Sequence, residues 1–197
     1  MQARVAAFLV LISVIALGAQ PRLTQQDAAR FGAKLARIEA FAAATTHASR
    51  GQSIELSDTE VNSYLRYMAG AQVPVGITEP TLNALGNGRV AGRAIVDLDA
   101  VRRQKQRGWM DPIGYLSGKV PVTAAGTLTT SNGTGRFQLE SAELSGVTVP
   151  KFVLQELLSY YSRTPEAPNG IDMDAPFQLP ARIKEIRVGT GTATVLQ

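Results

Sequence analysis

The stretch VTVPKFVLQELLSYYSR, residues 147–163, decides the fold prediction. Its start carries helix signals, because Thr148 is a capping residue type and Pro150 is tolerated in a first helical turn. The apolar stripe that follows is wider than the ~100° of an ordinary surface helix: Phe152, Val153, Leu154, Leu157, Leu158, Tyr160 and Tyr161. Such a helix needs cover on most of its circumference. We predict a helix over 150–163 that packs in the core of an α+β domain, or lies in a curved sheet that also holds an apolar ligand.

Three pairs of alternating apolar segments, each joined by a glycine-containing turn, surround this helix in the sequence. They are 77–85 with 89–98, 119–130 with 134–144, and 183–188 with 192–196. The turn pairs Asn87-Gly88 and Asn132-Gly133 are typical of tight hairpins, so we predict antiparallel hairpins. Several positions on one strand face are small: Gly92, Ala94, Ala124 and Gly126. They leave room on the sheet for a helix or for a ligand.

Two more helices are predicted before the first hairpin. Residues 24–48 begin with Thr24 and Asp27, a capping pattern, and continue with an apolar stripe: Ala28, Phe31, Leu35, Ile38 and Ala42. After a short strand at 54–56, Ser57 and Glu60 form a capping box that starts a helix over 58–69. Val61, Tyr64, Leu65 and Met68 share one face of it. We expect this helix to lie against the sheet, and the first helix to stand apart or dock loosely.

The chain begins like an exported protein. Arg4 precedes an apolar run over 5–17, and the small residues Ala16 and Gly18 stand at the end of that run, so we predict a signal peptide over residues 1–20. A retained anchor is the alternative. Residues 21–51 are expected to be a helix and linker, and 52–197 the domain. Because the 197 residues include no cysteine, we expect a bacterial periplasm or cell envelope as the location.

Composition and motifs exclude several functions. Charged residues make up 18% of the chain and the net charge is +4, which does not favour disorder or nucleic-acid binding. One histidine, His47, excludes zinc sites built on several histidines. No nucleophile or nucleotide-binding motif is present. The pairs Asp97 with Asp99 and Asp172 with Asp174 are weak cation candidates, so we predict a protein that is not an enzyme and has no cofactor or metal.

A basic run lies in the middle of the chain. Arg102, Arg103, Lys105 and Arg107 are followed directly by Trp109. The run is typical of a solvated loop or helix end. A basic run beside a tryptophan also suits contact with an anionic membrane, and we name these five residues as membrane-contact candidates.

The order of the predicted elements resembles a known superfamily. The segments that carry the likeness are LSDTEVNSYL (56–65), GRVAGRAIVDLD (88–99), LSGKVPVTAAGTLTTSNGTGRFQLESAELSGVTVP (116–150), the 150–163 helix and PFQLPARIKEIRVGTGTATVLQ (176–197). Together they resemble the tubular lipid-binding (TULIP) proteins, which include the BPI-like and SMP domains. The resemblance covers residues 52–197. It implies a strongly curved antiparallel sheet wrapped around a long apolar helix, with acyl chains held between them, in a single unit.

These observations lead to one functional prediction and one alternative. We predict an exported, non-enzymatic binder or carrier of lipid or another apolar ligand, with no nucleic-acid partner. The alternative is a structural or assembly module that acts through protein contacts and holds no ligand. The candidate ligand-binding residues are Phe152, Leu157 and Tyr161, with Tyr64 and Met68 opposite them.

Overall fold

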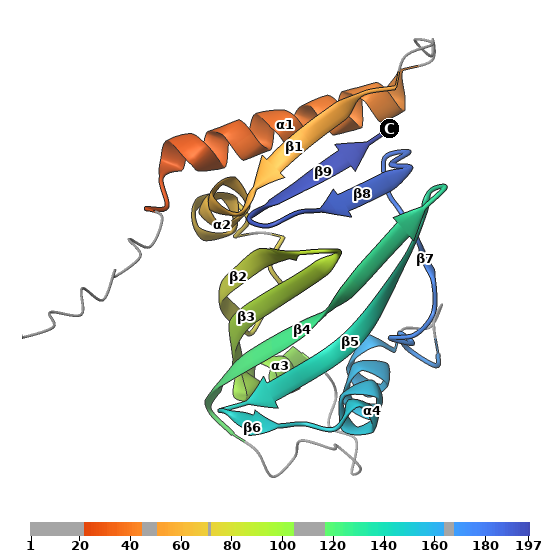
Figure 1. Ribbon diagram of the computed structural model, residues 1–197. Helices are drawn as coiled ribbons and strands as arrows, with labels where there is room; N and C mark the ends of the chain where they lie inside the picture. The colour runs from red at the N-terminus through yellow and green to blue at the C-terminus, as the bar shows by residue number, and fades with distance from the viewer. Residues whose placement is uncertain (1–21, 45–50, 71, 105–116, 164–167) are drawn as a thin grey trace, which may run out of the picture.

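A computed structural model describes residues 22–44, 51–70, 72–104, 117–163 and 168–197. It shows an α+β fold built on two antiparallel sheets (Figure 1). The elements are α1 (Gln25–Ala43), β1 (Ser53–Ser57), α2 (Asp58–Tyr67), β2 (Ile77–Gly86), β3 (Arg89–Asp97), α3 (Leu98–Gln104), β4 (Lys119–Ser131), β5 (Thr134–Leu144), β6 (Val147–Thr148), α4 (Lys151–Ser162), β7 (Phe177–Gln178), β8 (Glu185–Val188) and β9 (Thr192–Leu196).

The larger sheet has the order β2-β3-β4-β5-β6, and β7 also pairs with β5. We call it the main sheet. Its two long hairpins are the predicted ones. Asn87, Gly88, Asn132 and Gly133 all have positive φ angles between 49° and 81°, as a type I′ turn requires at both central positions. Local turn chemistry therefore sets the register of β2 with β3 and of β4 with β5.

The smaller sheet has the order β1-β9-β8, and α1 packs on it. Ile38 of α1 lies in one buried cluster with Ile54, Ile183 and Val195. The prediction that the first helix stands apart or docks loosely is therefore wrong. Its stripe of Ala28, Phe31 and Ile38 is buried, and the Gln197 side chain donates a hydrogen bond to the Ile38 carbonyl at 3.1 Å.

Helix α2 begins with the predicted capping box, because Ser57 and Glu60 exchange side-chain-to-backbone hydrogen bonds. The predicted apolar face is only partly correct. Tyr64 packs on Phe31 of α1 with ring centroids 5.0 Å apart, whereas Met68 is 52% exposed. The fully covered side of α2 is polar, and it includes Asn62.

Asn62 joins α2 to the free edge of the main sheet. Its amide oxygen accepts from the Leu82 backbone N–H at 2.7 Å, and its amide nitrogen donates to the Leu82 carbonyl at 2.7 Å. The Asp58 carboxylate accepts from the backbone N–H of Ala84 at 3.0 Å. These side chains satisfy backbone groups that an edge strand would otherwise expose. Helix α2 therefore lies against the sheet, as predicted, through polar contacts.

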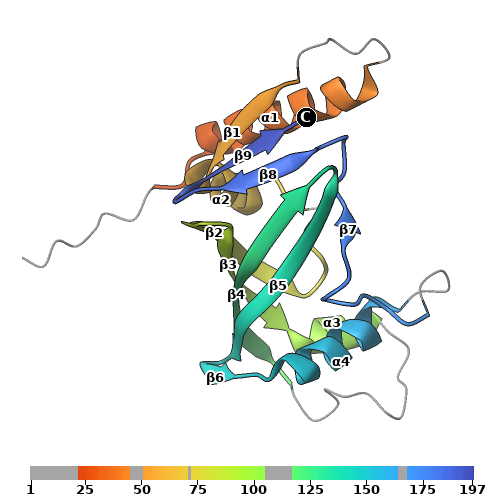
Figure 2. The same ribbon diagram turned by 45° about the vertical axis from the view of Figure 1, so that its right-hand side comes forward.

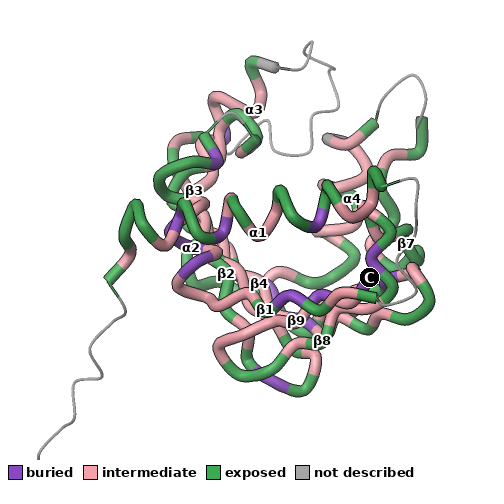
Figure 3. The backbone as a smooth tube through the Cα atoms, turned by 90° about the horizontal axis from the view of Figure 1, so that it is seen from above, coloured by how far each residue is buried: buried purple, intermediate pink, exposed green. Residues whose placement is uncertain are grey.

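The two sheets are hydrogen-bonded to each other where the main hairpins end beside β8 (Figure 2). The Thr130 hydroxyl donates to the Ile186 carbonyl at 3.0 Å and accepts from the Ile186 N–H at 2.7 Å. Gly88 N–H donates to the Val188 carbonyl at 3.2 Å. Viewed from above, α1 crosses over the sheets on this side (Figure 3).

Helix α4 differs from the predicted central helix. It starts after Pro150 without a side-chain cap, because Thr148 belongs to β6. The main sheet covers one side of α4 and does not enclose it (Figure 2). Phe152 is 70% exposed, and none of the α4 side chains that the structure describes is buried. The antiparallel α+β class is confirmed, and α4 forms a wall at one end of the sheet.

The predicted signal peptide, residues 1–20, and His47 lie outside the described residues. In the part of the chain that is described, no helix has the length and hydrophobicity needed to cross a membrane.

Candidate functional site

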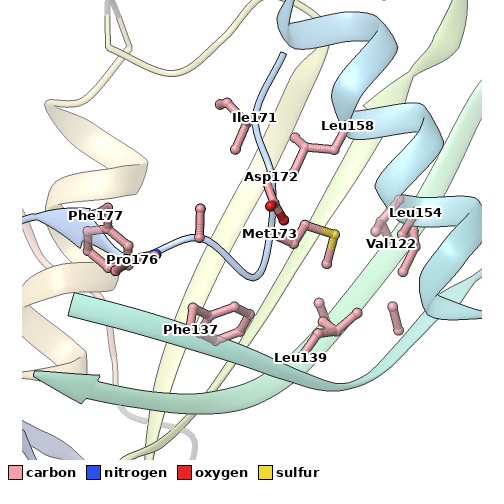
Figure 4. Close-up of a pocket in the computed structure, with 13 residues that line it drawn as sticks. Val122, Phe137, Leu139, Leu154, Leu158, Ile171, Asp172, Met173, Pro176 and Phe177 are labelled. Atoms are coloured by element: carbon pink, nitrogen blue, oxygen red, sulfur yellow. The ribbon is translucent and has the colours of Figure 1, made fainter. Parts of the chain in front are cut away.

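An apolar pocket of about 650 Å³ lies between the main sheet, α4 and the segment 168–177, which we call the strap (Figure 4). The sheet contributes Val122, Ala124, Phe137, Leu139 and Ala142 to its lining, α4 contributes Leu154 and Leu158, and the strap contributes Ile171, Asp172, Met173, Ala175, Pro176 and Phe177. All of these residues except Asp172 are apolar. The pocket is therefore suited to an apolar molecule or side chain, with one charged group at its edge.

The floor of the pocket is hollow because two alanines meet at its centre. Ala124 of β4 pairs directly with Ala142 of β5, and Gly92 of β3 is the next residue in the same row. Cross-strand partners project from the same face of a sheet. A row of hydrogen and methyl side chains, flanked by the longer Val122 and Leu139, leaves space above the sheet. Of the four small residues singled out in the sequence, Ala124 lines the pocket, whereas the Phe137 ring occupies the space beside Gly126 and the Leu82 side chain contacts the space beside Gly92.

A β-bulge in β5 keeps both halves of the strand facing the pocket. Leu139 pairs with Gly126, whereas Ser141 pairs with Ala125, so Glu140 is an extra residue. Glu140 turns to the opposite, polar face, where it accepts from the Thr127 hydroxyl at 2.6 Å and pairs with Arg89 at 2.8 Å. Bulges bend a strand and increase its local twist. The bulge therefore curves β5 at the pocket.

Helix α4 divides its circumference between the pocket and the strap. Leu154 and Leu158, one turn apart, line the pocket. On the neighbouring stripe, the Gln155 amide donates to the Ile171 carbonyl at 2.9 Å and accepts from the Met173 N–H at 2.8 Å. The Ser162 hydroxyl accepts from the Ile171 N–H at 2.6 Å. The strap is thus fastened along α4 much as a strand is fastened to its neighbour.

The other end of the strap is fixed to the main sheet. Residues 177–178 form β7 and pair with Thr134 and Gly135 of β5. The Phe177 ring lies so close to Gly135 that an added Cβ would come within 2.6 Å of it. Leu179 then packs against the core of the smaller sheet. Phe177 and Leu179 therefore attach this end of the strap to the main sheet and to the smaller sheet.

The charges beside the pocket belong to the strap and to the first turn of α4. The Asp172 carboxylate accepts from the Asp174 N–H at 2.8 Å. Asp174 in turn forms an ion pair with Lys151. Both carboxylates therefore take part in the geometry of the strap, and their side chains remain exposed.

The structure separates the five predicted ligand-binding residues into two groups. Tyr64 and Met68 face α1, on the far side of α2 from the main sheet. Phe152 is exposed, and Leu157 is half-buried but outside the pocket lining. The side chain of Tyr161 lies outside what the structure describes. The predicted pairing of Tyr64 and Met68 with α4 across a ligand is therefore wrong.

The pocket residues on α4 are the neighbours of the predicted ones. Leu154 and Leu158 take the place given to Phe152 and Leu157. The strap residues Ile171 and Met173 were not predicted at all, since no periodic pattern marks an irregular segment. The alternation of Val122, Ala124, Phe137 and Leu139 did predict the apolar face.

Of the five membrane-contact candidates, two fall on described residues. Arg102 and Arg103 are the last-turn residues of α3, and Arg102 pairs with Asp99. The backbone N–H of Gly118, followed by the Arg102 side chain, holds the pKa of Asp99 below its usual value. Arg103 is exposed. Lys105, Arg107 and Trp109 lie outside the described residues.

The candidate carboxylate pairs have structural roles in the described chain. Asp97 caps α3 by accepting from the Ala100 N–H at 2.8 Å, and Asp99 binds Arg102 and Gly118. Within the described ranges, no three histidine, aspartate or glutamate side chains gather as a metal site requires. Comparison with protein-family models, with curated proteins and with solved structures gives no match.

Proposed function

We propose that this protein is a non-enzymatic binder or carrier of a lipid or another apolar ligand, held in the pocket between the main sheet, α4 and the strap. The observation that carries the proposal is the lining, in which twelve of the thirteen residues are apolar. Its volume of about 650 Å³ falls within the roughly 300–1,000 Å³ of small-molecule sites. The resemblance to tubular lipid-binding proteins supports the same class of ligand.

The energetics favour a ligand with a hydrocarbon chain. Each methylene moved from water into an apolar site contributes about 0.8 kcal/mol. Roughly ten buried methylenes would then contribute about 8 kcal/mol, before the loss of translational and conformational freedom is subtracted. The alanine floor adds no polar group that such a chain would leave unpaired.

The proposal places the protein in the cell envelope, after export by the predicted signal peptide. There a carrier would collect its ligand from a membrane, and the basic run beginning at Arg102 is the proposed contact. Arg103 is the residue to test, because Arg102 is already paired with Asp99. Binding of Arg103→Glu to anionic vesicles should be weaker, by about 1 kcal/mol per lost charge. Equal binding of wild type and variant at low salt would remove this contact from the proposal.

Two measurements test whether a ligand binds. Native mass spectrometry and solvent extraction of the purified protein should show co-purified acyl lipid. The uncharged fluorophore N-phenyl-1-naphthylamine should brighten when the protein is added, because it enters an apolar site. Ala124→Leu should fill the pocket floor and abolish this uptake. Ala125→Leu, the same change on the other face of β4, is the matched control and should leave uptake unchanged.

The alternative function is a structural or assembly module that holds no ligand. It predicts lipid-free protein in every preparation, no fluorophore uptake by the wild type, and equal behaviour of the Ala124→Leu and Ala125→Leu variants. That set of results would replace the carrier proposal.

A further inference from the structure

The one charged residue of the pocket lining is Asp172. Its carboxylate lies between the side chains of Ile171 and Met173, where the strap passes over the pocket (Figure 4). The hydrogen bond that Asp172 accepts from the Asp174 N–H fixes this orientation, because an aspartate bonded two residues ahead closes a local turn. The carboxylate is therefore held at the edge of an otherwise apolar site.

No cation balances this carboxylate among the described residues. Lys151, the basic residue at the start of α4, is paired with Asp174. The next charged residue of α4 is Glu156, which is exposed. The Lys151–Asp174 pair is neutral as a whole, and Arg163, the C-cap of α4, lies over the Tyr160 ring at 5.9 Å from its centroid, so Asp172 supplies the net charge of the pocket lining. A carboxylate-headed ligand would meet repulsion there, and a cationic head would meet attraction.

We propose that the pocket takes an amphiphile whose hydrocarbon chain ends in a positively charged group, an ammonium, and that Asp172 receives that group. The inference rests on the proposed function, since the chain must first enter the pocket. The chain would contact Ala124, Ala142 and Leu158, and the ammonium would stay at the solvent-exposed strap. Both a free alkylamine and an amine-bearing lipid headgroup have this chemistry.

The test compares three competitors that share one chain and differ in the head. Dodecylammonium, dodecanol and dodecanoate each displace N-phenyl-1-naphthylamine from the wild-type protein at neutral pH and low salt. Dodecylammonium should displace it at a concentration roughly two- to five-fold lower than dodecanol, as for an exposed ion pair, and dodecanoate should be weaker still. Added salt should reduce the differences between the concentrations at which the three competitors displace the fluorophore.

Asp172→Asn removes the charge and keeps the oxygen that accepts from Asp174, so the strap should keep its geometry. In this variant the three competitors should become equal within error. Glu156→Gln removes one negative charge from α4 outside the lining and is the matched control, which should keep the wild-type order. A zwitterionic ethanolamine lipid, compared with its phosphatidic acid counterpart, then distinguishes a headgroup from a free amine.

Two outcomes would overturn the inference in different ways. Equal displacement by all three competitors in the wild type, or an unchanged order in Asp172→Asn, would refute the cationic head while leaving an apolar binder in place. No fluorophore uptake and no displacement by dodecanol would refute the binder itself, and the head preference with it.

Discussion

The two sheets each present an apolar face, yet only one of them is closed. On the smaller sheet, Ile54 and Val195 are each 4% exposed, because Ile38 of α1 packs into them. On the main sheet, Val122 and Leu139 are only half-buried, and Ile171 and Phe177 of the strap are exposed. Strand alternation thus makes an apolar face in both places. The residues at its centre, and the element that crosses it, decide whether the face becomes a core or a pocket.

Side-chain size explains the difference. Branched side chains fill the space between α1 and the smaller sheet, as close-packed interiors require. At the corresponding place on the main sheet stand Ala124 and Ala142, and the element above them is a strap held mainly by hydrogen bonds to α4. Polar fastening does not require the strap to sink into the sheet, so the space below it stays open.

The largest expected effect is in the closed region. Ile54→Ala removes buried methyl groups from the cluster around Ile38 and should lower the free energy of unfolding by about 2–5 kcal/mol. Urea denaturation of the variant and the wild type gives the difference. A loss below about 1 kcal/mol would show that this region is as loosely packed as the pocket, and would contradict the difference in packing between the two sheets.

The second effect is at the joint between the regions. Asn62→Ala leaves the Leu82 N–H and carbonyl without their partner, which should cost about 1–3 kcal/mol of unfolding free energy. Asn83→Ala makes the same change at an exposed position of β2 and should cost less than about 0.5 kcal/mol. Equal denaturation midpoints for the two variants would mean that the hydrogen bonds between Asn62 and Leu82 contribute nothing to stability.

The third effect concerns Leu158, an α4 residue of the pocket lining. Leu158→Ala should cost about 1 kcal/mol, less than Ile54→Ala, because fewer protein atoms contact a side chain that borders a cavity. Leu158→Trp should fold and block fluorophore uptake. Leu157→Trp, at the neighbouring position outside the lining, should leave uptake unchanged. A stability loss for Leu158→Ala as large as that for Ile54→Ala would mean that the pocket is a filled core.

The smallest effect is acid sensitivity of the closed region. Burial alone would raise the pKa of Glu60, but its hydrogen bonds and charge contact with Lys34, and its bond with the Ser57 backbone, lower the pKa below the usual value. A depressed pKa stabilises the folded state fully above the unfolded pKa of about 4.3, and this stabilisation is lost as the pH falls through the folded pKa. Glu60→Gln should therefore lose less unfolding free energy than the wild type between pH 7 and pH 3. Parallel losses in urea titrations would contradict the role of this ion pair.

Local chemistry made much of the fold predictable. Asn87-Gly88 and Asn132-Gly133 determine their turns, and the box of Ser57 and Glu60 starts α2, because each acts within a few residues. The pairing of β1 with β9 joins two segments that lie far apart in the sequence, and no local signal indicates it. Asn62 was equally hidden, since its partner is a backbone twenty residues away.

The pocket was predictable in its floor and not in its walls. Alternation placed Ala124 and Leu139 on the apolar face. Helix α4 is apolar around most of its surface, so its sequence did not indicate whether Leu157 or Leu158 faces the sheet. That choice depends on the direction in which β6 delivers the chain into α4, a tertiary property. The bulge did leave a signal: apolar residues of β5 are spaced by two up to Leu139, and by three from there to Ala142.

The extra residue in β5, Glu140, curves the pocket floor although its own side chain does not line the pocket. If Glu140 were deleted, Leu139, Ser141 and Ala142 would alternate without interruption and keep their present partners on β4. Every residue of the lining would remain, and only the bend and twist of the strand would relax. The curvature of the pocket floor and the chemistry of the pocket lining are therefore determined by different residues. Deletion of this one residue would change the shape of the pocket while the residues that line it stay the same.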